Sequence, residues 1–410
     1  MKRKCMIWFV VFAIVAGTCY LGWHRADNKF DQHTGQESND TDREIAEKEE
    51  LPTIEAEEPT DAEETLEIVA ADPFTVVEDW AVSEETFRIE GEGFEKLELC
   101  GISEEQIYFS YSLFDDVRMT LVYCMYDRMT KETKILHELE VRDVVFPPIT
   151  YNEHMYILDV KVPSYKIWDI CEEETTLYGE GECLYYPQLQ LCGSKLVIGV
   201  HQQKGADVIC TLSWADLLTK ESAVIETTKY KYDSERNVAN GTEICNAGGW
   251  EDGVIFETYS YDEEPRQTWQ RKKDYGEQEI WYYDFAAGTT TKQALTLGRH
   301  SYYVGGDESC IVIDCASLVD ALPKSGTMYE RTQSGYVSRN IPGVNATNSI
   351  VHAGKLANGQ ILLDCRGGFV LIDPKNDICT GEDTYNCTYS DTEIAFMNED
   401  GVVHVRKYVE

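Results

Sequence analysis

One sequence unit, a short polar or glycine-bearing turn followed by a hydrophobic strand, recurs about seven times after residue 86. The copies run from GISEEQIYFSYS at Gly101 to YSDTEIAFMN at Tyr389. The first strongly hydrophobic positions of the copies are Ile107, Tyr156, Leu196, Val254, Ile311, Ile361 and Ile394. Their mean spacing of about 48 residues is typical of radially repeated β-sheets. The repeat therefore predicts an all-β protein, a β-propeller.

A second signal follows the repeated strand and predicts the rest of a blade. A run that ends in a hydrophobic residue beside Asp precedes a polar turn, as at Trp168-Asp169 and Tyr283-Asp284. Such turns favour hairpins, and the short flanking runs rich in Tyr, Val and Ile favour strands. Strand, loop, strand, Asp turn and strand together predict a four-stranded antiparallel meander, which is one blade.

The two ends of the repeat region are both incomplete. Residues 385–410 supply about three strands, and residues 86–99 supply one or two strands without a blade of their own. An N-terminal strand added to the last blade would complete it and cover two exposed strand edges. We therefore predict a seven-bladed β-propeller closed by strands from both ends, with six or eight blades as the alternatives.

Three successive segments carry a resemblance to a known family. They are I-Y-F-S-Y from Ile107, L-V-Y-C-M-Y-D from Leu121 and T-K-E-T-K-I-L from Thr130. This pattern resembles bacterial TolB-like and WD40-like propeller repeats over most of residues 86–410. The Gly-His opening of WD40 blades is absent, and Trp168-Asp169 is the one literal Trp-Asp pair. The resemblance implies a propeller used for binding or assembly and transfers no catalytic residue.

The N-terminus predicts membrane attachment. Lys2, Arg3 and Lys4 precede an apolar run over residues 6–23, which as a helix is about 27 Å long. The positive-inside rule keeps the basic tip in the cytoplasm and places the rest outside. We predict a single-pass signal anchor over residues 1–25 and an extracytoplasmic globular domain at the cell membrane. A cleaved signal peptide is the alternative.

Residues 26–75 predict a disordered acidic linker, and residues 76–410 the propeller domain. The linker is rich in Glu, Asp, Thr and Pro and has too little apolar surface to offset its ordering entropy. The formal net charge of the whole chain is −38. So large a negative charge argues against nucleic acid as a partner and against direct adhesion to anionic lipid.

The cysteines predict core packing rather than a metal site. Of 14 cysteines, Cys5 and Cys19 belong to the predicted anchor. Several others, such as Cys124 and Cys210, lie inside apolar runs, where cysteine packs as a small hydrophobe. No C-x-x-C pair is present. We expect most strand cysteines to be buried and unpaired and expect neither a metal nor a cofactor, while the extracytoplasmic location leaves a disulfide open.

Three long segments, 229–241, 258–278 and 323–339, predict the binding face. In a four-stranded blade the b–c loop and the link to the next blade emerge on the same side. Aromatic residues interleaved with cations are good contact residues at interfaces. The predicted binding residues are Tyr230, Lys231, Tyr261, Trp269, Arg271, Lys272 and Lys273. Solvated insertions are the alternative interpretation.

A column of carboxylates is the candidate for chemistry. Asp159, Glu257, Asp314 and Asp364 stand three residues beyond four of the repeat positions. Carboxylates that converge can bind a cation or act as acid and base in sugar cleavage. The alternative is that they accept N–H groups of turns at strand ends. His352, between Val351 and Ala353, either lines the channel or is a hydrogen-bonded core histidine.

Motifs of common enzymes are absent from the sequence. It contains no G-x-S-x-G elbow, no P-loop and no G-x-G-x-x-G after a strand. We therefore predict a membrane-anchored extracytoplasmic propeller that binds an envelope protein or a glycan without catalysis. The alternative is an extracellular polysaccharide-acting glycosidase or lyase that uses the carboxylate column.

Overall fold

The described residues of this computed structural model form an all-β domain. They are residues 67–89, 97–114, 118–141, 146–171, 174–233, 238–265, 277–295, 301–315, 326–342, 350–365, 367–384, 386–398 and 401–409. All of them belong to the compact unit Leu66–Glu410. They contain thirty strands and no helix, and so no helix long and apolar enough to cross a membrane. The all-β prediction is confirmed; the predicted anchor and most of the predicted linker lie outside the described residues.

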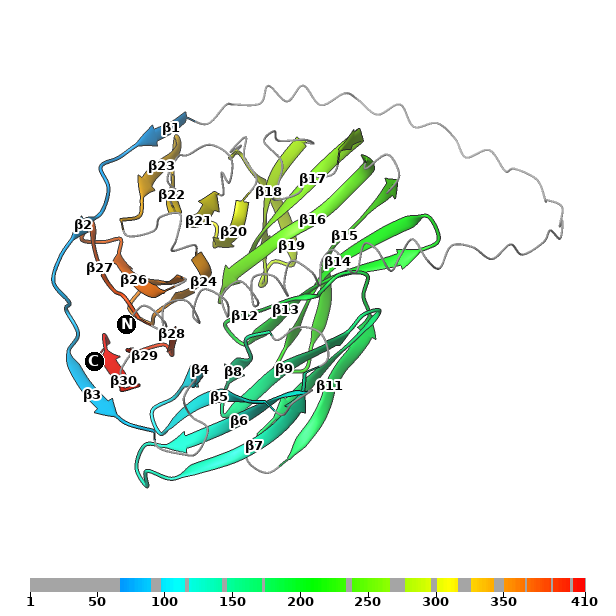
Figure 1. Ribbon diagram of the computed structural model, residues 1–410. Helices are drawn as coiled ribbons and strands as arrows, with labels where there is room; N and C mark the ends of the chain where they lie inside the picture. Colours follow the sequence, from blue (N-terminus) through cyan, green and yellow to red (C-terminus); the bar gives the residue numbers. More distant parts are fainter. Residues whose placement is uncertain are drawn as a thin grey trace, which may run out of the picture. The chain divides into compact units, whose positions relative to one another are not determined.

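Antiparallel meanders, in which each strand pairs with the next along the chain, make up the first sheets (Figure 1). One sheet consists of β4 (Glu98–Ile102), β5 (Gln106–Phe114), β6 (Met119–Asp127) and β7 (Thr133–Glu140). The next consists of β8 (Ile149–Tyr151), β9 (His154–Lys161), β10 (Ser164–Ile170) and β11 (Thr175–Glu182). An eight-stranded sheet follows, with β12 (Gln188–Cys192), β13 (Lys195–Lys204), β14 (Asp207–Asp216), β15 (Ser222–Asp233), β16 (Val238–Trp250), β17 (Gly253–Pro265), β18 (Glu277–Asp284) and β19 (Thr289–Gln293).

The last three sheets each take up one strand from the N-terminal segment. β20 (Ser301–Gly306), β21 (Cys310–Cys315), β22 (Gly326–Thr332) and β23 (Gly335–Asn340) are joined by β1 (Glu67–Ala70), parallel to β23. β24 (Ile350–Lys355), β25 (Ile361–Cys365), β26 (Gly368–Asp373) and β27 (Ile378–Glu382) are joined by β2 (Thr75–Val76), parallel to β27. β28 (Asn386–Tyr389), β29 (Glu393–Met397) and β30 (Val403–Lys407) are joined by β3 (Ser83–Phe87), antiparallel to β30.

The predicted addition of an N-terminal strand to the last sheet is confirmed by the pairing of β3 with β30. The strand is residues 83–87 rather than 86–99, because residues 98–102 form β4 in the next sheet. The number of blades stays a prediction, since the pairing of β15 with β16 unites two meanders in one sheet.

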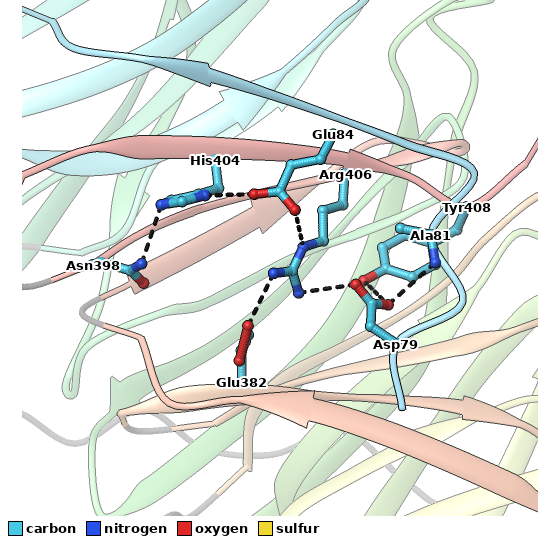
Figure 2. Close-up of polar contacts among 8 residues, drawn as sticks. All are labelled: Asp79, Ala81, Glu84, Glu382, Asn398, His404, Arg406 and Tyr408. Atoms are coloured by element: carbon cyan, nitrogen blue, oxygen red, sulfur yellow. Dashed lines mark hydrogen bonds and ion pairs between the residues drawn. The ribbon is translucent and has the colours of Figure 1, made fainter. Parts of the chain in front are cut away.

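Charged side chains of the last sheet hold the N-terminal segment in place (Figure 2). The Arg406 guanidinium on β30 lies 3.0 Å from a carboxylate oxygen of Asp79, 3.0 Å from one of Glu84 and 2.9 Å from one of Glu382. His404 adds a contact of 2.7 Å between its Nδ1 and Glu84. Asp79 and Glu84 flank the start of β3, so these contacts supplement the backbone pairing of β3 with β30.

The repeated strand recognised in the sequence is the second strand of each meander, not the innermost one. The repeat positions, from Ile107 on β5 to Ile394 on β29, are all buried. The strands that contact one another between sheets are instead the first ones, such as β4 with β8 and β28, and β20 with β16 and β24. Second strands are covered on both faces and therefore carry the strongest hydrophobic signal.

The three segments that were predicted to be long loops lie partly in strands, so the prediction of long loops was wrong for these parts. Residues 229–241 belong to β15 and β16 except for 234–237, and residues 258–265 and 277–278 extend β17 and β18. Residues 326–332 and 335–339 likewise lie in β22 and β23. The alternation in Tyr230-Lys231-Tyr232 is the pattern of a strand with one covered face. The strands β15, β16 and β17 therefore continue into segments that were predicted to be loops.

Candidate functional site

A cavity of about 1600 Å³ lies where the first strands of the meanders meet. Most of its lining comes from β4, β8, β12, β16, β24 and β28 and from the turns that follow several of them, and β5, β9 and β25 contribute single residues or pairs. Aromatic and proline residues contribute part of the wall, among them Phe146, Pro147, Tyr151, Trp250 and Tyr389. A concave site with apolar walls and a few polar groups has the usual character of a binding site.

The charged residues in this lining are mostly acidic. The carboxylates are Glu98, Glu153, Glu251, Asp252, Asp364 and Asp391. Lys355 is the one lysine or arginine among the described lining residues. Its ammonium lies 3.0 Å from Asp307 Oδ2 and 5.1 Å from the centre of the Trp250 ring, so part of its charge is already compensated. The cavity therefore favours a positively charged ligand.

Four titratable side chains lie together on β24, β25 and β28. His352 and Asp364 are cross-strand neighbours in the register of β24 and β25. The Tyr389 hydroxyl lies 3.4 Å from His352 Nδ1, and the Cys387 thiol donates to Asp364 Oδ1 over 3.3 Å. Burial lowers the pKa of His352 to about 4 and raises the pKa of Asp364 to about 6. At neutral pH the histidine is therefore uncharged and the aspartate ionised.

A glycine makes this arrangement possible. A Cβ atom added at Gly354 would lie 2.1 Å from atoms of the Tyr389 ring, far inside van der Waals contact. The aromatic ring of β28 therefore lies directly against the backbone of β24. His352 and Tyr389 both line the cavity, and the His352 side chain is part-buried there.

The predicted carboxylate column does not gather in this cavity in the described part of the chain. Asp364 lines it, whereas Asp159 on β9 is half-buried and is not part of the lining. Glu257 is fully buried and accepts hydrogen bonds from Asn246 Nδ2 (2.6 Å) and Gln278 Nε2 (2.7 Å). These two bonds compensate the burial of Glu257, as expected of a structural carboxylate. The side chain of Asp314 lies outside the described residues.

Of the predicted binding residues, the three that the structure describes are not brought together at one surface. Tyr230 and Tyr261 are buried in the hydrophobic core between neighbouring parts of the eight-stranded sheet, because they lie on its covered face. Lys231 is exposed, and its ammonium lies 4.0 Å from Asp207. Trp269, Arg271, Lys272 and Lys273 lie outside the described residues. Most of the cavity lining could not be predicted from the sequence, because the first strands carry a weaker hydrophobic pattern than the second strands.

Most cysteines of the described residues pack as core side chains. All eleven described cysteines are free, and eight of them are buried, as predicted for strand cysteines. Burial raises the pKa of the Cys192 thiol to about 12, which keeps it protonated. Among the described residues, no group of three or more His, Cys, Asp or Glu side chains is placed to hold a metal ion.

No protein-family model matches the sequence, and a search of curated proteins finds no match. Some solved structures are similar to this chain at low identity. An acylaminoacyl peptidase from Pyrococcus horikoshii is 11% identical with a TM-score of 0.49, over 74% of this chain and 49% of that chain. The present chain thus spans about half the length of that protein.

Two shorter structures are covered more completely. The β-propeller domain of the trilobed protease from Pyrococcus furiosus is 11% identical with a TM-score of 0.46, over 73% of this chain and 90% of that domain. TolB from Acinetobacter baumannii is 11% identical with a TM-score of 0.35, over 75% of this chain and 80% of that one. These likenesses, with TM-scores below 0.5, transfer no function.

Proposed function

We propose that this chain is a membrane-anchored, extracytoplasmic β-propeller of seven blades. It binds an envelope partner through the cavity of about 1600 Å³ at the first strands, called the central cavity below, and performs no catalysis. The blade count takes the eight-stranded sheet as two meanders, β12–β15 and β16–β19. The observation that carries the proposal is the cavity of about 1600 Å³, to whose lining six separate first strands contribute. Rigid strands hold such a lining in place before a partner arrives, which lowers the entropic cost of binding.

The acidic lining selects the kind of partner. Six carboxylates face one lysine in the described lining, and Trp250 and Tyr151 add aromatic surface. A lysine- or arginine-rich segment of a protein complements both, through ion pairs and through cation–π contacts. We therefore propose a cationic segment of an envelope protein as the occupant.

The proposed location is supported by the N-terminal sequence and not by a feature of the described domain. The basic tip and the apolar run over residues 6–23 support a single-pass anchor with the propeller outside the cell membrane. Protease added to intact cells should release a soluble domain by cutting within residues 26–66. Protection of the domain in intact cells would overturn the orientation, and an N-terminus found near residues 17–20 would replace the anchor by a cleaved signal.

Binding to the cavity is tested by removing its charge. Fluorescence anisotropy at low salt would follow labelled hexalysine binding to the full-length chain in detergent. Glu251→Gln combined with Asp252→Asn should weaken binding about tenfold, because two carboxylates of the lining are neutralised. The matched control neutralises Glu132 and Glu221, which are exposed and lie outside the lining. Equal losses in both double variants would overturn the cavity as the site.

The alternative function is cleavage of an extracellular polysaccharide by a glycosidase or lyase, and the glycosidase mechanism uses two carboxylates at one site. Of the predicted column, Asp364 alone is in the described cavity lining. Assays of the wild type and of Asp364→Asn on polysaccharides would decide between the two functions. Cleavage that is lost in Asp364→Asn would establish an enzyme and overturn the non-catalytic proposal, whereas unchanged polymer in both samples supports it.

A further inference from the structure

A second cavity, a groove of about 640 Å³, crosses the eight-stranded sheet from β14 and β15 to β18. β15 pairs with β16 at residues 230–233, where the two strands form a hairpin. Before this hairpin β15 pairs with β14, and after it β16 pairs with β17. The two strands therefore separate, and the groove opens where they diverge.

Side chains from three strands share the face that lines this groove. In the sheet register Thr242 lies opposite Ser260, Thr258 opposite Glu279, and Phe256 opposite Trp281. Directly opposed residues project to the same side of a sheet. The Thr242 and Ser260 hydroxyls lie 3.1 Å apart, and the indole N–H of Trp281 donates to Thr258 Oγ1 over 3.0 Å. The latter bond fixes the orientation of the indole ring.

The chemistry of the lining is unlike that of the central cavity. Five hydroxyl side chains line the groove, from Thr227, Thr228, Thr242, Thr258 and Ser260. Trp281 supplies aromatic surface beside the fully buried Phe256, and Glu226 and Glu279 supply acceptors. A sugar ring has an apolar C–H face, which suits an aromatic ring, and a rim of hydroxyls, which both donate and accept hydrogen bonds.

We propose that this groove binds a neutral oligosaccharide, with a sugar ring against Trp281 and with its hydroxyls bonded to the surrounding threonine, serine and glutamate side chains. The site shares no residue with the central cavity, so it is independent of the function proposed above. A volume of about 640 Å³ is within the range of small-molecule sites and accommodates more than one sugar ring.

Charge selects a neutral rather than an anionic sugar. The groove contains Glu226 and Glu279 against Lys229, and Glu279 is itself paired with Lys292 over 2.7 Å. The Lys229 ammonium lies 3.8 Å from Asp207, so it is partly compensated. The net charge of −38 for the whole chain also repels an anionic polymer at long range. Hydroxyl-rich ligands without carboxylates fit these conditions best.

The test titrates the full-length chain, in a detergent without a sugar head group, with maltotriose, cellotriose, chitotriose and the anionic trigalacturonate. Calorimetry would measure affinity. At least one neutral trisaccharide should bind saturably, and Trp281→Ala should weaken its binding at least about tenfold. The matched control is Trp168→Ala, because Trp168 is a part-buried tryptophan on β10, the third strand of its own sheet, and lies outside the groove.

A second variant protects the test from a folding defect. Thr242→Val combined with Ser260→Ala removes both members of a hydrogen-bonded pair, so neither is left unsatisfied. It should also weaken binding of the neutral sugar. Absence of binding by every neutral trisaccharide, preference for trigalacturonate, or equal affinity in wild type and in this double variant would each overturn the proposal.

Discussion

Removal of the Arg406 side chain should release the N-terminal strand from the last sheet. Arg406 is 14% exposed and contacts three carboxylates, those of Asp79 and Glu84 on the N-terminal segment and that of Glu382 on β27 (Figure 2). Its guanidinium also lies 4.8 Å from the centre of the Phe396 ring. In the Arg406→Ala variant the three carboxylates would face one another without a cation.

The size of the effect follows from the burial of these groups. Breaking a fully buried ion pair costs roughly 3–5 kcal/mol. The three carboxylates here are between 29% and 39% exposed, so water partly replaces the lost cation. We expect the free energy of unfolding to fall by about 2 kcal/mol, which includes the lost cation–π contact with Phe396.

Urea unfolding and hydrogen exchange would measure this effect. Arg406→Ala should lower the midpoint of unfolding, and the backbone amides of β3 should exchange faster, because Glu84 lies on that strand. Arg118→Ala is the matched control. Its ion pair with Glu140 is 3.7 Å long between largely exposed groups and should contribute less than about 1 kcal/mol.

Two results would refute this reasoning. Equal destabilisation by Arg406→Ala and Arg118→Ala would mean that Arg406 and its three carboxylates stabilise the fold no more than one exposed ion pair does. A loss of stability without faster exchange in β3 would mean that Arg406 acts within the last sheet and not on the N-terminal strand.

Three further predictions concern single residues. Gly354→Ala should lower the free energy of unfolding by about 2 kcal/mol or more, because its Cβ would overlap the Tyr389 ring, whereas Gly179→Ala on β11 meets no atom within 4 Å and should be nearly neutral in urea unfolding. Burial raises the pKa of Asp364 to about 6, so the free energy of unfolding should fall as pH rises from about 4 to 6. Asp364→Asn should abolish that decline and raise the free energy of unfolding by roughly 2 kcal/mol at pH 7. The pKa of Asp216 is lowered to about 2, because hydrogen bonds to its carboxylate outweigh the effect of burial. Its contribution to the free energy of unfolding should therefore be present above pH 4 and lost as pH falls toward 2. A stability difference between wild type and Asp216→Asn that does not change over this pH range would contradict this prediction.

Several properties of this protein follow from local sequence pattern. The repeat positions on the second strands are buried from both sides, so they stay hydrophobic in every copy and reveal the all-β repeat. The Asp turns are equally local: the Asp127, Asp216 and Asp284 carboxylates accept N–H groups two and three residues further along the chain. An incomplete last unit was enough to predict that an N-terminal strand completes it.

The candidate sites were decided by tertiary structure. Asp364 and Cys387 are 23 residues apart and meet only because β25 and β28 belong to adjacent sheets. Tyr230 and Lys231 are neighbours in sequence, yet one is in the core and the other in solvent, since alternate residues of a strand face opposite ways. The local sequence pattern indicates which residues are buried, because burial restricts the residue types within each strand. Which side chains meet across a cavity or groove depends on how the sheets pack, and no single strand carries that information.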